Sequence, residues 1–187
     1  EQRIEVQDLT SPDFTFVPSD MTVECDAVPT VGVATAIDNC TPFPGVEYAG
    51  ETRENGSCAD NYRLFRRWIA TDECGNTRSA EQVLTVEDTT SPVFQFVPAD
   101  ATVNCEAIPG MGTPIVTDNC DQNVNLVPST QLLTNSDCSS GGMIIRRWIA
   151  TDNCGNTALA EQHLTVQDTT RPVFTFVPAD ATVSCEA

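Results

Sequence analysis

The chain has 187 residues, which is enough for two small domains that each lie near the lower size limit for a self-supporting core. Its formal net charge is −18 at pH 7, and all nine basic residues are arginine because the sequence contains no lysine. This charge disfavours binding to nucleic acid or to anionic membranes, and no apolar run approaches the roughly 18 residues that a membrane-spanning helix needs.

The sequence contains an internal repeat with a period of 80 residues. The segment RRWIATDECGNT at 66–77 recurs as RRWIATDNCGNT at 146–157, and the flanking segments keep the same offset without insertion or deletion. In this register the chain divides into the last strand of a preceding repeat at 1–7, complete repeats at 8–87 and 88–167, and the first strands of a following repeat at 168–187. We therefore interpret the sequence as a segment of a longer tandem array.

The last strand of each repeat shows strict alternation. Apolar residues occupy every second position at 4–6, and the equivalent positions 84–86 and 164–166 keep this pattern, which predicts a half-buried strand. The only histidine, His163, falls on the opposite face of this strand. We therefore interpret it as an exposed strand residue and not as a catalytic one.

The segment that follows in each repeat begins at a proline. Pro12 bars the preceding residue from a helix, and a strand-like alternation follows at 14–16. A further extended segment ends at Asp38. Residues 41–63 and 121–143 are the least alike of the two copies, and their content of Gly, Asn, Ser and Pro predicts short strands and loops.

A tryptophan-containing strand precedes the final strand of each repeat. Trp68 and Trp148 alternate with Ile69 and Ile149, and a tryptophan in the central strand of a sandwich typically belongs to the core. The isoleucines then face outward, which raises the hypothesis that copies of the chain pack laterally into a fibre. Because helical periodicity is weak throughout, the sequence predicts an all-β fold of tandem, disulfide-stapled, immunoglobulin-like β-sandwich repeats.

Nine cysteines occur at matching offsets in the repeats, which indicates an oxidising compartment and a disulfide framework. They are Cys25, Cys40, Cys58, Cys74, Cys105, Cys120, Cys138, Cys154 and Cys185. A zinc site is the alternative, but neighbouring cysteines are separated by at least 14 residues, without the close C-x-x-C pairs of zinc sites. The partner of Cys185 is expected to lie beyond this segment.

Several motifs at fixed spacing resemble a known family. They are DTTSP at 88–92, TVNC at 102–105, TDNC at 117–120 and RRWIATDNCGNT at 146–157. This combination resembles the HYR-like, immunoglobulin-like repeats of very large bacterial surface proteins, including gliding-motility adhesins of the SprB type that are exported by type IX secretion. The resemblance implies a sandwich fold and a location at the bacterial cell surface.

A topological argument selects among the possible disulfide pairings. In a sandwich with an odd number of strands, the chain enters at one pole and leaves at the other, which places Cys40 beside Cys74 and Cys25 beside Cys58. We predict the pairs Cys25–Cys58, Cys40–Cys74, Cys105–Cys138 and Cys120–Cys154. The pairing of Cys25 with Cys40 and of Cys58 with Cys74 is the alternative.

The same geometry gathers acidic side chains at the N-terminal pole of each repeat. We expect two carboxylate sets there, namely Asp8, Asp38 and Asp72, and Asp88, Asp118 and Asp152. Such clusters suit calcium, a hard cation that takes six to eight oxygen ligands and tolerates irregular geometry. The alternative is that these residues only form turns, since Asp before Cys or Gly commonly caps its own backbone.

Short sequence patterns also indicate glycosylation. Asn55 and Asn39 each begin an Asn-x-Ser/Thr sequon. Thr89 and Thr169 lie in Asp-Thr-Thr segments that resemble the O-glycosylation pattern of bacteria that make such adhesins.

The sequence offers almost no catalytic groups, since it has no lysine, one histidine and no glycine-rich phosphate loop. We therefore expect no enzymatic activity and no required cofactor, with calcium as the candidate ion. The leading hypothesis is a structural and adhesive segment of an extracellular bacterial surface filament, with gliding motility as a further candidate role. Its expected partners are neighbouring repeats, other copies in a fibre, and surface glycans or proteins. The alternatives are an array of carbohydrate- or partner-binding modules and accessory domains of a secreted enzyme.

Overall fold

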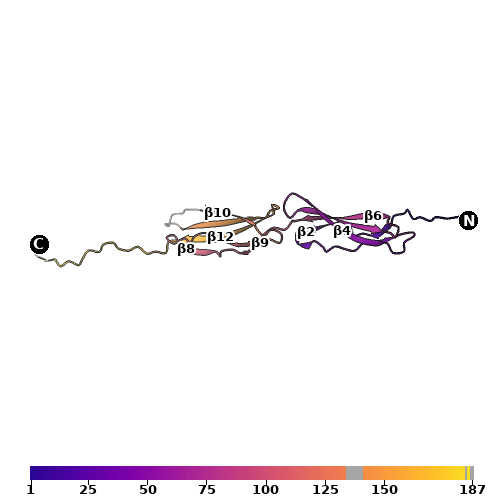
Figure 1. Cartoon of the computed structure of the whole chain (residues 1–187). Helices are drawn as coiled ribbons and strands as arrows, with labels where there is room; N and C mark the ends of the chain where they lie inside the picture. Colours follow the sequence, from indigo (N-terminus) through magenta and orange to yellow (C-terminus); the bar gives the residue numbers. More distant parts are fainter. Residues whose placement is uncertain (134–140, 184, 186–187) are drawn as a thin grey trace. The chain divides into compact units, whose positions relative to one another are not determined.

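The computed structural model describes residues 1–133, 141–183 and 185, and the ribbon is drawn in Figure 1. The described elements are β1 (Asp13–Phe16), β2 (Met21–Glu24), a short 3-10 helix (Cys25–Ala27), β3 (Thr35–Ile37), β4 (Gly45–Asn55), β5 (Tyr62–Thr71), β6 (Thr77–Glu87), β7 (Val93–Phe96), β8 (Ala101–Asn104), β9 (Ile115–Thr117), β10 (Asn125–Leu133), β11 (Gly142–Thr151) and β12 (Thr157–Gln167). None of the described helices is long and apolar enough to cross a membrane.

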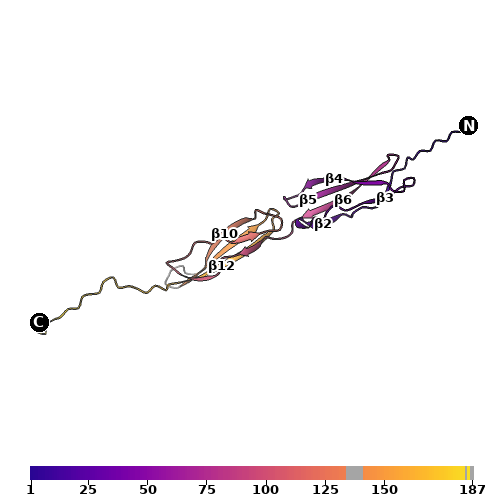
Figure 2. The same ribbon diagram turned by 60° about the horizontal axis from the view of Figure 1, so that its bottom comes forward.

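Each repeat builds one two-stranded and one four-stranded sheet. In the first repeat β1 pairs with β3, and the larger sheet has the order β2-β6-β5-β4; the second repeat has the pair β7-β9 and the order β10-β11-β12-β8. Figure 2 shows β4, β5 and β6 side by side, and these strands are antiparallel, whereas β2 joins β6 in parallel. The prediction of an all-β, sandwich-like fold is confirmed, whereas the repeat boundaries stay a prediction.

The backbone contacts divide the chain into two compact units that do not coincide with the repeats. One unit comprises residues 1–97, 114–128 and 148–160, and the other comprises 98–113, 129–147 and 161–187. All side chains of the site described below lie in the first of these units.

Alternation along the central strands defines the core. Trp68 on β5 and Trp148 on β11 are only 2% and 1% exposed, which confirms that both tryptophans are core residues. The Tyr48 ring lies 5.7 Å from the Trp68 ring, in a tilted arrangement that aromatic pairs favour. On the outward face Ile149 is 44% exposed, whereas Ile69 is half-buried.

The arginine two residues before each tryptophan is also buried, and its charge is matched by oxygen atoms. Arg66 donates to the Pro29 carbonyl at 2.8 Å and to the Glu51 carboxylate at 3.0 Å. Its equivalent, Arg146, donates to the Gly110 carbonyl at 2.9 Å. A buried guanidinium is tolerated only when it is paired and hydrogen-bonded. The repeated arginine therefore fastens the extended segment that precedes the third strand of each repeat.

The variable segment 41–63 differs from its expected structure. It contains the 11-residue strand β4 instead of short strands and loops. This strand lies at the edge of its sheet and is mostly exposed, so its sequence lacks the alternation of a half-buried strand. Gly50, at φ 108°, marks an irregularity in the pairing of β4 with β5. The equivalent segment contains β10.

An ion pair on the second repeat gives a pH prediction. Arg147 donates to Glu161 at 2.5 Å and His163 lies 3.2 Å from the same carboxylate, and these hydrogen bonds lower the pKa of Glu161. A lowered folded-state pKa stabilises the fold above the unfolded value of about 4.3, and this contribution is lost as pH falls through the folded value. We expect Glu161→Gln to lower the melting temperature modestly at pH 7, because the pair is partly exposed.

Thermal unfolding between about pH 2.5 and pH 7 tests this prediction, since the difference from wild type should vanish at the acidic end. Glu81→Gln, at the equivalent position of the first repeat, is the matched control because the described residues show no ion pair for Glu81. An equal, pH-independent effect of both substitutions would contradict the prediction.

Candidate metal centre

A tight loop after β5 holds Asp72, the aspartate of the repeated segment at 66–77. The Asp72 amide donates to the Asn76 carbonyl at 3.1 Å, and the Asp72 Oδ1 atom accepts from the amides of Cys74 at 2.9 Å and Asn76 at 2.8 Å. Gly75 has φ 88°, a left-handed conformation that favours glycine. The Asn76 side chain donates to the Asp8 carbonyl at 3.1 Å. The loop thereby joins the start of the repeat to the end of its tryptophan strand.

The second repeat uses the same construction for three aspartates that follow β6, β9 and β11. In each of Asp88, Asp118 and Asp152, the Oδ1 atom caps the turn that the residue itself begins. The donors are Thr90 N to Asp88 at 3.2 Å, Cys120 N and Asp121 N to Asp118 at 2.9 Å each, and Cys154 N and Asn156 N to Asp152 at 2.8 and 2.9 Å. Turn formation therefore occupies one oxygen of each carboxylate.

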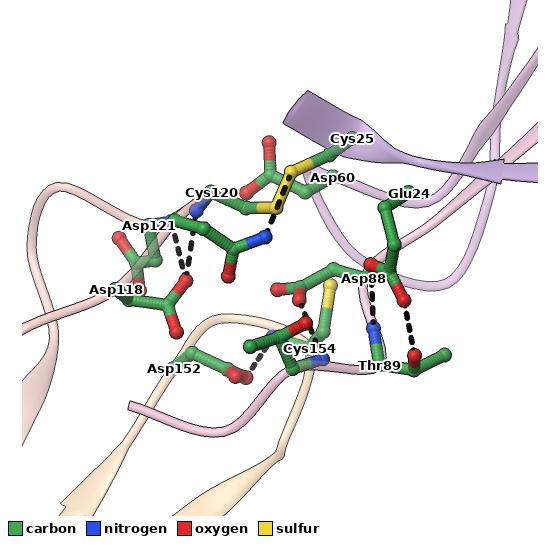
Figure 3. The surroundings of a disulfide bond; sticks show 12 residues. Glu24, Cys25, Asp60, Asp88, Thr89, Asp118, Cys120, Asp121, Asp152 and Cys154 are labelled. Atoms are coloured by element: carbon green, nitrogen blue, oxygen red, sulfur yellow. Dashed lines mark hydrogen bonds between the residues drawn. A yellow bond between two sulfur atoms is a disulfide. The ribbon is translucent and has the colours of Figure 1, made fainter. Parts of the chain in front are cut away.

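The remaining oxygens of these aspartates are buried and unsatisfied. One carboxylate oxygen from each of Asp88, Asp118 and Asp152 lies within 4.8 Å of the other two. All three Oδ2 atoms are buried and have no hydrogen-bond partner among the described residues, and Asp88 and Asp152 are only 4% and 6% exposed. Figure 3 shows the three side chains around a common space. The aspartate set predicted for this repeat is thus brought together.

The first repeat forms the equivalent cluster. Carboxylate oxygens of Asp8, Asp38 and Asp72 lie within 4.8 Å of one another. The Oδ2 atoms of Asp8 and Asp38 are buried without a partner among the described residues, whereas Asp72 Oδ2 accepts from Asn76 at 2.7 Å. Two clusters of the same composition therefore occur one repeat apart.

Burial and neighbouring negative charges both affect the pKa of Asp88, the aspartate in the linker between the repeats. Burial, followed by the carboxylates of Asp152, Asp118 and Glu24, raises the pKa of Asp88, against the opposing hydrogen bond from the Thr90 amide. Such a group resists a full negative charge unless a cation or a proton neutralises it.

Glu24 lies beside this cluster and was not among the predicted site residues. Its carboxylate, on β2, has an oxygen within 4.8 Å of ligand atoms of Asp88 and Cys120, and it accepts the Thr89 amide at 3.2 Å and the Thr89 hydroxyl (Figure 3). Its repeat counterparts are Asn104 and Ser184, so comparison of the repeats gave no sign of a functional carboxylate.

The disulfides of the structure join one repeat to the next. Cys25 pairs with Cys120 across a Cα–Cα distance of 6.0 Å, and Cys58 pairs with Cys154 across 5.1 Å. The predicted pairs Cys25–Cys58 and Cys120–Cys154 are therefore wrong, as is the alternative pairing of Cys25 with Cys40. The topological argument treated each repeat alone, whereas here the loops of the first repeat meet the loops around the second aspartate cluster.

The predicted pair Cys40–Cys74 is also absent, because both residues are free, exposed thiols. Desolvation and the nearby carboxylates of Asp8 and Asp38 raise the pKa of Cys40. The predicted pair Cys105–Cys138 involves Cys138, which lies outside the described residues.

Hydrogen bonds accompany the disulfides at this junction. Asn153 donates to the Asp60 carboxylate at 2.6 Å, and Asn156 donates to the Asp88 carbonyl at 3.1 Å. The Asp88 amide in turn donates to the Asn61 side chain at 2.8 Å. The backbone amide of Asp88 is thus bonded to a residue of the first repeat, and its carbonyl to a residue of the second. These two bonds fix the position of the Asp88 carboxylate.

The candidate glycosylation positions are exposed. Asn55 ends β4, Thr89 follows β6, and Thr169 follows β12. The Thr89 hydroxyl donates to Glu24, and the Thr169 hydroxyl accepts from Asn104 at 2.8 Å. Glycosylation at these residues stays a prediction that intact mass measurement can check.

Comparison with known proteins places part of the chain. Residues 95–166 match the family described as an HYR-like domain with 4 cysteines. No curated protein matches the chain significantly.

Several solved structures match the chain at low similarity. Drosophila N-cadherin EC1-4 is 10% identical, with a TM-score of 0.37 and coverage of 85% of this chain and 50% of that chain. Human mucin-like protocadherin EC1-2 is 12% identical, with a TM-score of 0.35 and coverage of 84% and 98%. The Ig1-2 module of the Drosophila receptor protein tyrosine phosphatase DLAR is 14% identical, with a TM-score of 0.30 and coverage of 84% and 100%.

Two observations bear on the location of the protein. The structure contains disulfides that join successive repeats, and disulfides persist in oxidising compartments. The match to an HYR-like domain agrees with this. The disulfides and the HYR-like match of residues 95–166 together indicate an extracellular protein.

Proposed function

We propose that this segment is a load-bearing, non-catalytic part of an adhesin or filament at the bacterial cell surface. The observation that carries the proposal is the pair of disulfides between successive repeats, Cys25–Cys120 and Cys58–Cys154. The motifs that resemble repeats of gliding-motility adhesins support the bacterial location. Neighbouring repeats of the same chain are the first partners that this role requires.

The disulfides bridge the linker between the repeats. Strand β6 ends at Glu87 and β7 begins at Val93, so a short stretch of chain forms the only main-chain connection. The two disulfides start from different loops of the first repeat and end in different loops of the second. Tension applied to the chain therefore passes from repeat to repeat through sulfur–sulfur bonds as well as through the linker. A ligand-binding module does not need this construction, whereas a stalk gains resistance to extension from it.

Single-molecule stretching of the full chain tests this proposal. The disulfides close loops with sequence separations of 95 and 96 residues, and an extended residue spans about 3.3–3.6 Å. Reduction should therefore lengthen the fully unfolded chain by about 310–350 Å between the outermost linked cysteines.

Pairings within each repeat predict a different result. A disulfide between Cys25 and Cys58, with its equivalent in the second repeat, would release only about 110 Å per repeat on reduction. Observing such short, separate increments would contradict the load-bearing connection between repeats. Peptide mapping without reductant gives an independent check, since the proposal requires a peptide pair containing Cys58 and Cys154.

A further inference from the structure

We propose that Asp88, Asp118 and Asp152 bind a calcium ion with an affinity set by the adjacent disulfides, and that Asp8, Asp38 and Asp72 form a weaker site of the same kind. This inference does not depend on the load-bearing role.

The unsatisfied oxygens are the first argument for an ion. Turn formation accounts for every Oδ1 atom of the second cluster but leaves three buried Oδ2 atoms without partners among the described residues. Buried polar atoms without hydrogen bonds are destabilising, and three neighbouring carboxylates also repel one another. A bound divalent cation removes both costs at once.

The donor set and its spacing favour calcium. Calcium–oxygen distances are about 2.3–2.6 Å, so two oxygens on one ion can be at most about 4.6–5.2 Å apart. One carboxylate oxygen from each aspartate lies within 4.8 Å of the other two, so all three can reach a common calcium ion. Hard carboxylate donors from three separate loops suit calcium better than magnesium, which demands near-ideal octahedral geometry, or zinc, which prefers nitrogen and sulfur ligands.

The disulfides are connected directly to two of the three carboxylates. The amide of Cys120 donates to Asp118 at 2.9 Å, and the amide of Cys154 donates to Asp152 at 2.8 Å. Cys120 and Cys154 are in turn bonded to Cys25 and Cys58. Reducing these bonds frees both ligand loops to move relative to Asp88. The oxidised chain therefore holds the ligands in place before the ion arrives, and such preorganisation increases affinity.

The first cluster serves as an internal comparison. Its turns are the same, since the amides of Cys40 and Cys74 donate to Asp38 and Asp72 at 2.9 Å each. Here, however, Asp72 directs its Oδ2 atom to Asn76, so only Asp8 and Asp38 keep a buried Oδ2 atom without a partner among the described residues. We therefore infer lower calcium affinity at this cluster.

Calorimetric titration of the oxidised, chelator-treated chain with calcium chloride tests the sites. We expect two binding events, with the stronger one lost in Asp152→Asn and retained in the matched variant Asp72→Asn. Asparagine keeps an oxygen that can cap the turn, and circular dichroism should show that both variants fold. Absence of binding up to about 10 mM calcium, a range that covers weak extracellular sites, would overturn the calcium proposal. Equal effects of the two substitutions on the stronger site would overturn the assignment.

The dependence on disulfides has its own test. Joint replacement of Cys25, Cys58, Cys120 and Cys154 by serine should weaken the stronger site by at least about tenfold, whereas Cys40→Ser with Cys74→Ser should change neither site. Unchanged affinity would refute the coupling while leaving calcium binding itself in place.

A measurement on the unaltered chain covers the case in which the serine variant fails to fold. Coupling is reciprocal, so saturating calcium should make the two disulfides harder to reduce by a similar factor, about tenfold in the equilibrium with a dithiol reductant. Equal extents of reduction with calcium and with chelator would refute the coupling.

Discussion

Replacing Cys25 and Cys120 together by serine is expected to lower the free energy of unfolding by about 4 kcal/mol. The chain-entropy model gives about 4.7 kcal/mol for a loop of about 100 residues, and this disulfide has a sequence separation of 95. The retained Cys58–Cys154 bond closes an overlapping loop, which reduces the effect slightly. Since a small domain is stabilised by only 5–15 kcal/mol in general, the loss should be plain in urea unfolding.

The two free thiols provide the control for this experiment. Cys40→Ser with Cys74→Ser removes the first-repeat equivalents of Cys120 and Cys154, which are free thiols in this structure. We expect a change of no more than about 0.5 kcal/mol, as for most exposed positions. A loss as large as that of Cys25→Ser with Cys120→Ser would show that Cys40 and Cys74 are bonded in the folded protein, contrary to the structure.

Trp148→Ala is expected to destabilise the second repeat by about 3–5 kcal/mol, because removing a buried aromatic side chain leaves a cavity that the surroundings fill only in part. The tryptophan is 1% exposed on β11, and its neighbour Ile149 points to the other face and is 44% exposed. Ile149→Ala on the same strand should therefore cost much less.

Thermal and urea unfolding, followed by far-ultraviolet circular dichroism in both variants, would measure this difference on equal terms. A similar loss for the two substitutions would mean that the face carrying Ile149 is also covered, which is the outcome expected if copies of the chain pack laterally at that face.

Strand positions that face the core could be predicted from the sequence. Period-two alternation placed Trp68 and Trp148 inside, and the structure agrees. The same reasoning failed for β4, because an edge strand with solvent on most sides carries no alternating pattern. Local periodicity reports burial, so it detects strands only where burial is one-sided.

The aspartate clusters could also be predicted, since the alternating strand directions bring loops after β3 and β5 to one pole with the start of the repeat. The disulfide partners could not. Every cysteine recurs at an offset of 80 residues, so the sequence fits Cys25 with Cys58 in one repeat as well as Cys25 with Cys120 in the next. Only the packing of one repeat against the loops of another decides between them.

The parallel pairing of β2 with β6 determines how a repeat responds to pulling. Four residue pairs, from Met21 with Leu84 to Glu24 with Glu87, join the strands in parallel, and Leu164 to Gln167 repeat this with Ala101 to Asn104. Force that enters through the beginning of β2 and leaves through the end of β6 acts at opposite ends of the paired segment. Its hydrogen bonds are then loaded in shear and must rupture together, instead of opening one by one like a zipper.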